Sequence, residues 1–186
     1  MKILYIISGV TGMTGNELAR KLLQDDCEVI GFDNFFASTI KTVEDLLDNE
    51  SFYFYEYDIN NIIQMDALKK VILEKKSQFA KIVYINCAAV VHTEHFYHVN
   101  STFSTNVIGM KSLLEQAVEV GAEIYINCST SEVYSMASWN EVADLLEQDG
   151  YTDEAIEIKA IVARHYGKPD KQWEKIIKLD YYRPLV

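Results

Sequence analysis

The chain has 186 residues, of which 49% are hydrophobic, so one domain of ordinary size with a sizeable core is expected. Its formal net charge of −11 argues against nucleic acid or an anionic membrane as a main partner, although backbone amides can still hold a phosphate ligand. No hydrophobic run reaches the length of a membrane span and no signal-peptide cleavage site follows the start, so we expect a cytoplasmic protein.

The first predicted elements are a strand, a glycine-rich turn and a helix. The strand is expected at Lys2–Ser8, the turn at Gly9–Gly15 and the helix at Asn16–Gln24. Glycines permit a tight turn and close backbone approach, and a helix N-terminus presents N–H groups to a pyrophosphate. This order is typical of a dinucleotide-phosphate cradle, and an ordinary turn between strand and helix is the alternative.

A second strand, Glu28–Asp33, ends at a carboxylate. Asp33 lies at the distance from the glycine turn expected for the group that binds an adenosine ribose, with a plain surface aspartate as the alternative. The elements expected after it are, in order, a helix at Thr42–Leu47, a strand at Phe52–Tyr57, a helix at Met65–Lys75, a strand at Lys81–Asn86, a helix at Ser101–Val120 and a strand at Glu123–Cys128.

This alternation of strands and helices predicts the fold class. Continuous hydrophobic strands indicate a parallel sheet that is covered by helices on both faces. Right-handed crossovers then give an α/β, doubly wound (Rossmann) fold with its ligand at the carboxyl ends of the strands. The candidate site residues all fall at those ends.

Three cysteines are present, an odd number without CxxC spacing. Cys87 and Cys128 end two near-identical segments, 83–87 and 124–128, so their thiols lie close together if those strands are neighbours. Reduced, buried cysteines that act as small hydrophobic residues are the alternative, for these two and for Cys27.

A histidine cluster follows the fourth strand. His92, His95 and His98 have the spacing of one helical face, with Glu94 between them. We interpret the segment as a solvated loop near the substrate and expect no metal site.

Several motifs appear in the order of a known family. They are Ser8-Gly9-Val10-Thr11-Gly12-Met13-Thr14-Gly15, Gly31-Phe32-Asp33-Asn34, Tyr57-Asp58-Ile59-Asn60, Asn86-Cys87-Ala88-Ala89, Asn106-Val107-Ile108-Gly109 and Cys128-Ser129-Thr130-Ser131-Glu132-Val133-Tyr134. The chain resembles the extended short-chain dehydrogenase/reductase family, in particular its NAD-dependent epimerase/dehydratase branch acting on nucleotide sugars. The resemblance covers roughly residues 1 to 140.

The resemblance implies NAD as the cofactor. The charge of Asp33 would repel the 2′-phosphate of NADP, Met13 and Thr14 would offer backbone to the pyrophosphate, and Asp58 with Ile59 would hold the adenine edge. A helix cap is the alternative for Asp58, and mere packing is the alternative for the two alanines of the cofactor floor. The implied cofactor-binding residues are Gly9, Gly12, Met13, Thr14, Gly15, Asp33, Asn34, Asp58, Ile59, Cys87, Ala88, Ala89, Asn106 and Ser129.

The resemblance also implies catalytic positions. Thr130 lies where the family has the serine or threonine that hydrogen-bonds the reacting sugar, with a plain turn after the strand as the alternative. Ser131 and Glu132 lie where the dehydratase branch has an acidic pair, and only Glu132 is acidic, which weakens a dehydratase assignment.

The family's tyrosine, with a lysine four residues later, is missing from this chain. Tyr151 is followed at that spacing by Ala155, and Tyr166 by Asp170. The tyrosine transfers the proton, and the lysine lowers the tyrosine pKa and binds the nicotinamide ribose. We therefore expect impaired or absent catalysis.

Beyond Trp139 the resemblance ends. We expect an NAD-binding domain at 1–139 and a helical tail at 140–186 that ends before the family's substrate domain could be built. Acidic residues from Glu141 to Glu157 and basic ones from Lys159 indicate complementary helix faces or a partner surface, with solvated faces as the simpler explanation. The expected tail elements are a helix at Asn140–Gln148, a turn at Asp149-Gly150, a helix from an N-cap at Thr152 to Tyr166 closed by Gly167, and a third segment from Pro169 to Ile176–Leu179.

The functional hypothesis is an NAD-binding protein of the nucleotide-sugar epimerase/dehydratase family. The alternatives are a non-catalytic NAD(H)-binding or assembly module and a truncated or rearranged fragment. A nucleotide sugar is one expected partner, and the family resemblance suggests a homodimer through Ser101–Val120.

Overall fold

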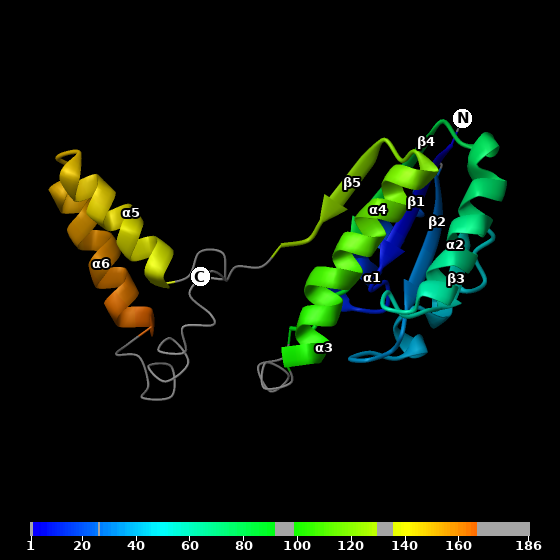
Figure 1. Cartoon of the computed structure of the whole chain (residues 1–186), viewed down its shortest axis with the longest axis horizontal. Coiled ribbons are helices and arrows are strands. Elements are labelled where there is room, and N and C mark those ends of the chain that lie inside the picture. The colour runs from blue at the N-terminus through cyan, green and yellow to red at the C-terminus, as the bar shows by residue number, and fades with distance from the viewer. Residues whose placement is uncertain (1, 26, 92–98, 130–135, 167–186) are drawn as a thin grey trace. The chain divides into compact units, whose positions relative to one another are not determined.

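A computed structural model describes residues 2–25, 27–91, 99–129 and 136–166. The chain divides into two compact units, Met1–Cys128 and Ser129–Val186 (Figure 1). The boundary that we expected between residues 139 and 140 falls inside helix α5, Met136–Gln148.

The N-terminal unit is built on a five-stranded parallel sheet. The strand order is β3-β2-β1-β4-β5, so the winding reverses between β1 and β4 at the centre of the sheet. Such a switch point opens a crevice at the carboxyl ends of the strands, and the predicted doubly wound fold is confirmed. The strands are β1 (Ile3–Ser8), β2 (Cys27–Asp33), β3 (Phe52–Glu56), β4 (Lys81–Asn86) and β5 (Ile124–Asn127).

Helices cover both faces of this sheet. On one face, Ala19 of α1 packs against Ile7 and Val29, and on the other, Leu68 of α2 and Leu113 of α4 join the cluster around the β-strands. Figure 1 shows α4 and α2 in front of the sheet, with α1 behind it. The helical segments are α1 (Met13–Leu22), α2 (Ile62–Lys75), the short η3 (Lys76–Gln78), α3 (Val99–Phe103), the π-helical η5 (Ser104–Gly109) and α4 (Met110–Val120).

The strand sequences are hydrophobic without a break because both faces are buried. In β1, Leu4 and Ile6 face the α2/α4 layer, whereas Ile7 faces α1. A buried hydrogen bond joins β4 to α4 within the α2/α4 layer: the Tyr84 hydroxyl donates to Gln116 Oε1 at 3.2 Å. Burial raises the pKa of Tyr84, so this hydroxyl stays protonated and can act as the donor.

The helix expected at Thr42–Leu47 is wrong in type. The segment forms two 3₁₀ turns, η1 (Ile40–Thr42) and η2 (Glu44–Leu46), separated by the buried Val43. Thr42 and Val43 are β-branched, which disfavours a helix. The Thr42 hydroxyl also donates to Thr11 O at 2.9 Å, which ties the segment to the glycine turn.

Three other helices of the N-terminal unit begin earlier than the hydrophobic pattern indicated, and one of them is α1, which begins at Met13 and not at Asn16. Helix α2 begins at Ile62 because the Asn61 side chain caps it, accepting from the N–H groups of Ile63 and Gln64. The segment expected at 101–120 begins at Val99 and contains a π turn that ends at Gly109. A Cβ at Gly109 would lie 2.9 Å from Ile59 Cγ2, so glycine permits the close approach there.

The second unit contains an antiparallel pair of helices, α5 and α6 (Thr152–Tyr166), around buried Ala143 and Ala155. Helix α5 begins at Met136, before the expected Asn140, whereas the turn at Asp149-Gly150 is confirmed by the positive φ of +88° at Gly150. Helix α6 begins at Thr152, one residue earlier than predicted, because Tyr151 and not Thr152 takes the cap position: the Tyr151 carbonyl accepts from Ala155 N–H at 3.1 Å. Gly167, which was expected to close this helix, and the third segment from Pro169 lie outside the described residues.

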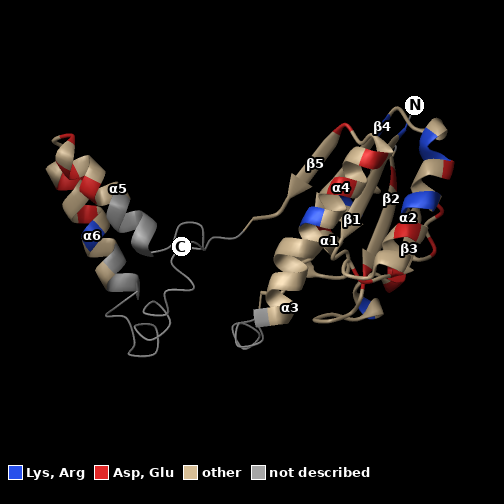
Figure 2. Cartoon of the chain, in the orientation of Figure 1, with Lys and Arg blue, Asp and Glu red and all other residues tan. Residues whose placement is uncertain are grey.

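Opposite charges join these two helices. Lys159 on α6 lies 2.8 Å from Asp144 Oδ1 and 2.8 Å from Glu147 Oε2 on α5. Hydrogen bonds to these two carboxylates raise the pKa of Lys159. In Figure 2 red segments, which mark acidic residues, recur along the ribbon of these two helices. The contacts of Lys159 therefore join α6 to acidic residues of α5. Among the described residues, no helix is long and hydrophobic enough to cross a membrane.

Gly31→Ala is expected to lower the free energy of unfolding by about 1–3 kcal/mol through overpacking. A Cβ at Gly31 in β2 would lie 2.8 Å from both γ-carbons of Val10, which is fully buried. Val10→Ala removes those carbons, so the double variant should lose less stability than the sum of the two single losses, as urea denaturation of all three would show. Strictly additive losses would contradict the contact.

Candidate nucleotide-binding site

A pocket of about 340 Å³ lies at the carboxyl ends of the strands. Its walls come from the glycine turn, the loops after β2, β3 and β4, and the start of the α3–η5 helix. The volume falls in the range of small-molecule and cofactor sites. The lining residues are Gly9, Gly12, Phe32, Asp33, Asn34, Phe36, Ala37, Ser38, Tyr57, Asp58, Ile59, Asn60, Cys87, Ala88, Ala89, Val90, Ser101, Ser104 and Thr105.

Gly9 must be glycine for two reasons. Its φ is +69°, a conformation that L side chains rarely adopt, and a Cβ there would lie 2.7 Å from Ala88 N. Its N–H donates to Phe32 O at 2.9 Å. The turn therefore packs directly on the backbone that follows β4 and lies between β2 and β4.

Gly12 and Gly15 have different roles. Gly12 is the N-cap of α1 with ordinary backbone angles, and a Cβ on it would meet only Gly9 O, at 3.2 Å. Gly15 is buried and does not line the pocket; a Cβ on it would overlap the Gly9 carbonyl, so its role is to let the helix pack on the turn. Met13 and Thr14 follow in the first turn of α1 and also lie outside the pocket lining.

The first turn of α1 is suited to an anion. It contains no acidic residue, and Gly12 supplies no side-chain cap. The first N–H groups of a helix have no intrahelical acceptor, and the helix dipole adds a partial positive charge there. A phosphate group therefore fits this end of the helix better than a neutral ligand.

Asp33 is held in place by backbone donors from two loops. Thr11 N–H donates to Oδ2 at 3.2 Å, and Phe35 N–H donates to Oδ1 at 2.9 Å. Phe35 has a positive φ of 57°, which directs its N–H back to the carboxylate. The carboxylate lines the pocket and has lone pairs left for ligand hydroxyls.

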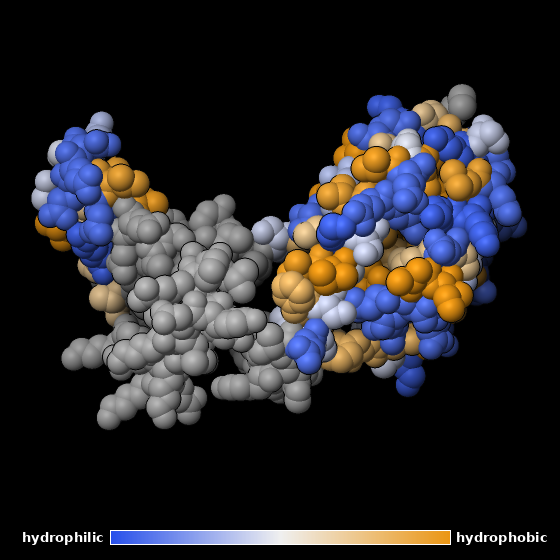
Figure 3. Space-filling view, in the orientation of Figure 1, coloured by the Kyte–Doolittle hydropathy of each residue, from blue (hydrophilic) through white to orange (hydrophobic). Residues whose placement is uncertain are grey.

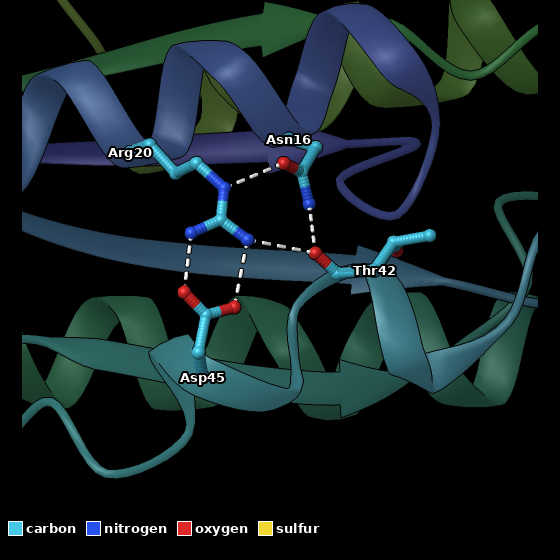
Figure 4. Close-up of polar contacts among 4 residues, drawn as sticks. All are labelled: Asn16, Arg20, Thr42 and Asp45. Carbon is cyan, nitrogen blue, oxygen red and sulfur yellow. Dashed lines mark hydrogen bonds and ion pairs between the residues drawn. The ribbon is translucent and has the colours of Figure 1, made fainter.

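The loop after β2 is fastened to α1 by a group of polar contacts (Figure 4). Arg20 donates from Nη2 to Asp45 Oδ1 at 2.7 Å and to Thr42 O at 3.0 Å, and from Nε to Asn16 Oδ1 at 2.8 Å. Asn16 in turn donates to Thr42 O. The hydrogen bond from Arg20 lowers the pKa of Asp45. Arg20 Nη1 also donates to Asp45 Oδ2, so the ion pair is bidentate and fixes the loop that brings Phe36 and neighbouring residues to the pocket.

A second polar network joins the loop after β3 to the helix after β4. Asp58 Oδ1 accepts from Asn60 N–H at 2.8 Å, and its Oδ2 accepts from Asn34 Nδ2 at 3.0 Å. Asn60 donates to Thr105 Oγ1 at 3.0 Å and accepts from the Ser104 hydroxyl at 2.9 Å. The helix-cap interpretation of Asp58 is wrong, because Asn61 caps α2.

Asn106 has a different position from the one that the family resemblance implied. Its side chain accepts from Val90 N–H at 2.7 Å and donates to Val90 O at 3.0 Å, and it does not line the pocket. It therefore positions the loop after β4, because one amide satisfies both backbone groups of Val90.

The structure brings nine of the predicted site residues together in one pocket, whereas the described residues Met13, Thr14, Gly15 and Asn106 do not line it. Ser129 is exposed and lies outside the lining, whereas Thr130, Glu132 and the histidine cluster fall outside the described residues. Sequence reasoning missed the loop at 36–38 and the helix residues Ser101, Ser104 and Thr105. The small polar residues that open the expected helix at 101 were the available signal. In the described part of the chain, no three His, Cys, Asp or Glu side chains form a group that could hold a metal ion.

Known proteins have similar sequences. UDP-glucuronic acid decarboxylase 1 of Danio rerio is 30% identical over 129 residues, which is 69% of this chain and 28% of that protein. The enzyme of the same name from Arabidopsis thaliana is 31% identical over 134 residues, covering 72% of this chain and 27% of that protein. The chain therefore spans under a third of these relatives' length.

Solved structures of other proteins have a similar fold. The UDP-Glc/GlcNAc 4-epimerase of Campylobacter jejuni has a TM-score of 0.59 and 25% identity, over 72% of this chain and 39% of the other. The Bordetella bronchiseptica enzyme WbmG, solved in complex with NAD, has a TM-score of 0.60 over 73% of this chain and 40% of that one, and its 18% identity shows the fold alone. The model of the "NAD dependent epimerase/dehydratase family" matches residues 5–154. By this match, which covers most of its length, the chain belongs to the NAD-dependent epimerase/dehydratase family.

Proposed function

We propose that this chain binds NAD in the pocket at the carboxyl ends of the strands, with its pyrophosphate at the N-terminus of α1 and its adenosine ribose at Asp33. The observation that carries the proposal is the joint placement of Gly9, Gly12 and Asp33 in one pocket, with the uncapped first turn of α1 beside it. The Thr11 and Phe35 N–H groups hold the carboxylate ready for two vicinal hydroxyls.

In the proposed binding mode, each wall of the pocket contacts a different part of the cofactor. Gly12 would leave the approach to the helix N–H groups open, and Asp58 and Ile59, which line the pocket, would hold the adenine edge. Cys87 and Ala88 present small side chains on the floor beneath the dinucleotide. NAD, when bound, supplies a hydride acceptor for the oxidation of an alcohol.

A nucleotide sugar is the proposed second ligand, by analogy with the UDP-sugar enzymes that the chain resembles. We propose that turnover of such a sugar is weak or absent. None of the 12 tyrosines has a lysine four residues later, and a positioned general acid–base group contributes about 10²–10⁴-fold. Thr130 by itself offers a hydroxyl and no base.

Calorimetric titration and a turnover assay on the same preparation test both halves of the proposal. NAD is expected to bind at one site per chain. Incubation with NAD and either UDP-glucuronic acid or UDP-glucose is expected to give neither NADH nor a new sugar nucleotide. Absence of binding would overturn the cofactor proposal. Turnover at an ordinary rate that is lost in Thr130→Ala would show that another residue has replaced the tyrosine.

We also propose a homodimer through the helical segment at 99–120. Its outer face carries exposed hydrophobic side chains with helical spacing at Phe103, Val107, Leu114 and Val118, the last of them 72% exposed. In Figure 3 hydrophobic side chains (orange) lie among hydrophilic ones on the face that α4 occupies in Figure 1. A second copy of the same face would remove this surface from water.

Val118→Glu is expected to give a monomer in sedimentation equilibrium where the unmodified chain gives a dimer. Dimerisation would bury the new carboxylate, and the free-energy cost of removing its hydration disfavours the contact. Leu73→Glu, on the exposed side of α2, is the matched control and should leave the dimer intact. A monomeric unmodified chain, or equal effects of the two variants, would contradict this interface.

A further inference from the structure

Two cysteines at the ends of adjacent strands, Cys87 and Cys128, lie side by side, and Cys87 also lines the pocket. Asn86 of β4 pairs with Asn127 of β5, and Cys128 N–H continues the ladder by donating to Asn86 O at 2.9 Å. Cys87 and Cys128 therefore occupy the next opposed positions, and their sulfur atoms are 3.5 Å apart.

This placement is compatible with a covalent bond between the two sulfurs. Neighbouring strands are about 4.7–4.9 Å apart, which is within the range of Cα separations of about 4.4–6.8 Å found in disulfides. The sulfurs already contact each other, and a disulfide requires them to approach to about 2.05 Å. The third cysteine cannot compete at this position, because Cys27 is buried at the start of β2 and its thiol contacts Leu22 O.

We propose that Cys87 and Cys128 form a dithiol modification site that closes to an intramolecular disulfide when the chain meets a small disulfide oxidant such as oxidised glutathione. The two thiols differ in a way that sets the order of events. Cys128 is exposed, whereas Cys87 is half-buried. Burial, together with the hydrogen bond to Cys128, raises the pKa of the Cys87 thiol to about 12. Cys128 is therefore the thiol that attacks first.

The reaction balances in two steps. The Cys128 thiolate attacks one sulfur of oxidised glutathione, which breaks the S–S bond of that molecule and releases one glutathione thiolate. Cys87 then loses its proton and attacks Cys128 Sγ in the mixed disulfide, which releases the second glutathione. The chain loses two electrons and two protons, and the oxidant gains them as two molecules of glutathione.

The bond would change a wall of the pocket. Cys87 lines the pocket, and its backbone packs on the glycine turn, where a Cβ at Gly9 would lie 2.7 Å from the Cys87 carbonyl carbon. Closure would pull the Cys87 sulfur toward β5 and away from the position that it has in the reduced chain. The site proposed here stands on the sulfur geometry and does not depend on the nature of the pocket's ligand.

The test uses the reduced, purified full chain with oxidised glutathione as the probe. After treatment, unfolding and thiol titration, the expected number of thiols falls from three to one, since two of the three cysteines are consumed. Mass spectrometry should find the peptide of Cys87 joined to that of Cys128, and the rate of closure should not depend on protein concentration. Retention of all three thiols, a link that involves Cys27, or a link between chains would overturn the proposal.

Matched variants separate the two steps. Cys87→Ser should stop after the first step and accumulate a stable glutathione adduct on Cys128, because the second thiol is missing. Cys128→Ser should react at most slowly, because only the half-buried Cys87 thiol remains at the site. Cys27→Ser should close at the rate of the unmodified chain, and equal reactivity of all three variants would contradict the assignment.

Discussion

Replacing Asp33 with alanine is expected to weaken NAD binding by about 1–3 kcal/mol, which is roughly 5- to 150-fold in the dissociation constant. The carboxylate is fixed by Thr11 and Phe35 N–H groups and would accept hydrogen bonds from both ribose hydroxyls. Calorimetric titration of the variant and of the unmodified chain measures the difference.

The same substitution should narrow the preference for NAD over NADP. A negative charge at Asp33 disfavours a 2′-phosphate, and alanine removes that charge. Asp48→Ala is the matched control, because Asp48 is exposed and lies outside the pocket lining, so its loss changes the net charge equally. Equal affinity of the unmodified chain for NAD and NADP, or equal effects of the two variants, would contradict the role of Asp33.

Gly12→Val is expected to abolish NAD binding while the fold remains. Gly12 has φ −74° and ψ 164°, angles that a β-branched residue adopts readily, and its Cβ would meet only Gly9 O, at 3.2 Å. The branched side chain would instead fill the approach to the N-terminus of α1. Circular dichroism checks the fold, and calorimetric titration checks binding.

A series at the glycine turn separates binding from stability. Gly12→Ala adds a single methyl group and should give an intermediate affinity. Gly15→Ala should lower the melting temperature instead, because its Cβ overlaps the Gly9 carbonyl. If Gly12→Val folds and still binds NAD, the phosphate cradle is misplaced.

The sequence predicted the sheet well because its signal is local. The strands expected near Lys2–Ser8 and Lys81–Asn86 are confirmed to within one residue, since each is a continuous hydrophobic run bounded by polar residues or glycine. The segment at 42–47 failed because its conformation depends on a contact with the glycine turn. The helix propensity of these six residues carries no information about a hydrogen bond to a carbonyl that is distant in the sequence.

In the candidate site, too, the sequence identified the residues with local signals and missed those that meet only through long-range contacts. Gly9, Gly12 and Asp33 were found because their spacing follows from one strand–turn–helix unit and the next strand. The opposite wall was missed, since Asn60 meets Thr105 across 45 residues of sequence. Asn106 was found by its motif, yet only the structure shows that its amide holds Val90.

By itself, the sequence determined the parallel α/β class, the glycine turn and the carboxylate that ends the second strand, because periodicity and short spacings are properties of contiguous residues. The tertiary structure alone decided that β4 lies beside β1 and β5, that five chain segments enclose one pocket, and that Cys87 and Cys128, 41 residues apart, bring their sulfurs into contact. Strand order depends on contacts between residues that are far apart in the sequence. Many ways of pairing these strands bury a similar hydrophobic area, and the packing of helices on both faces selects one of them.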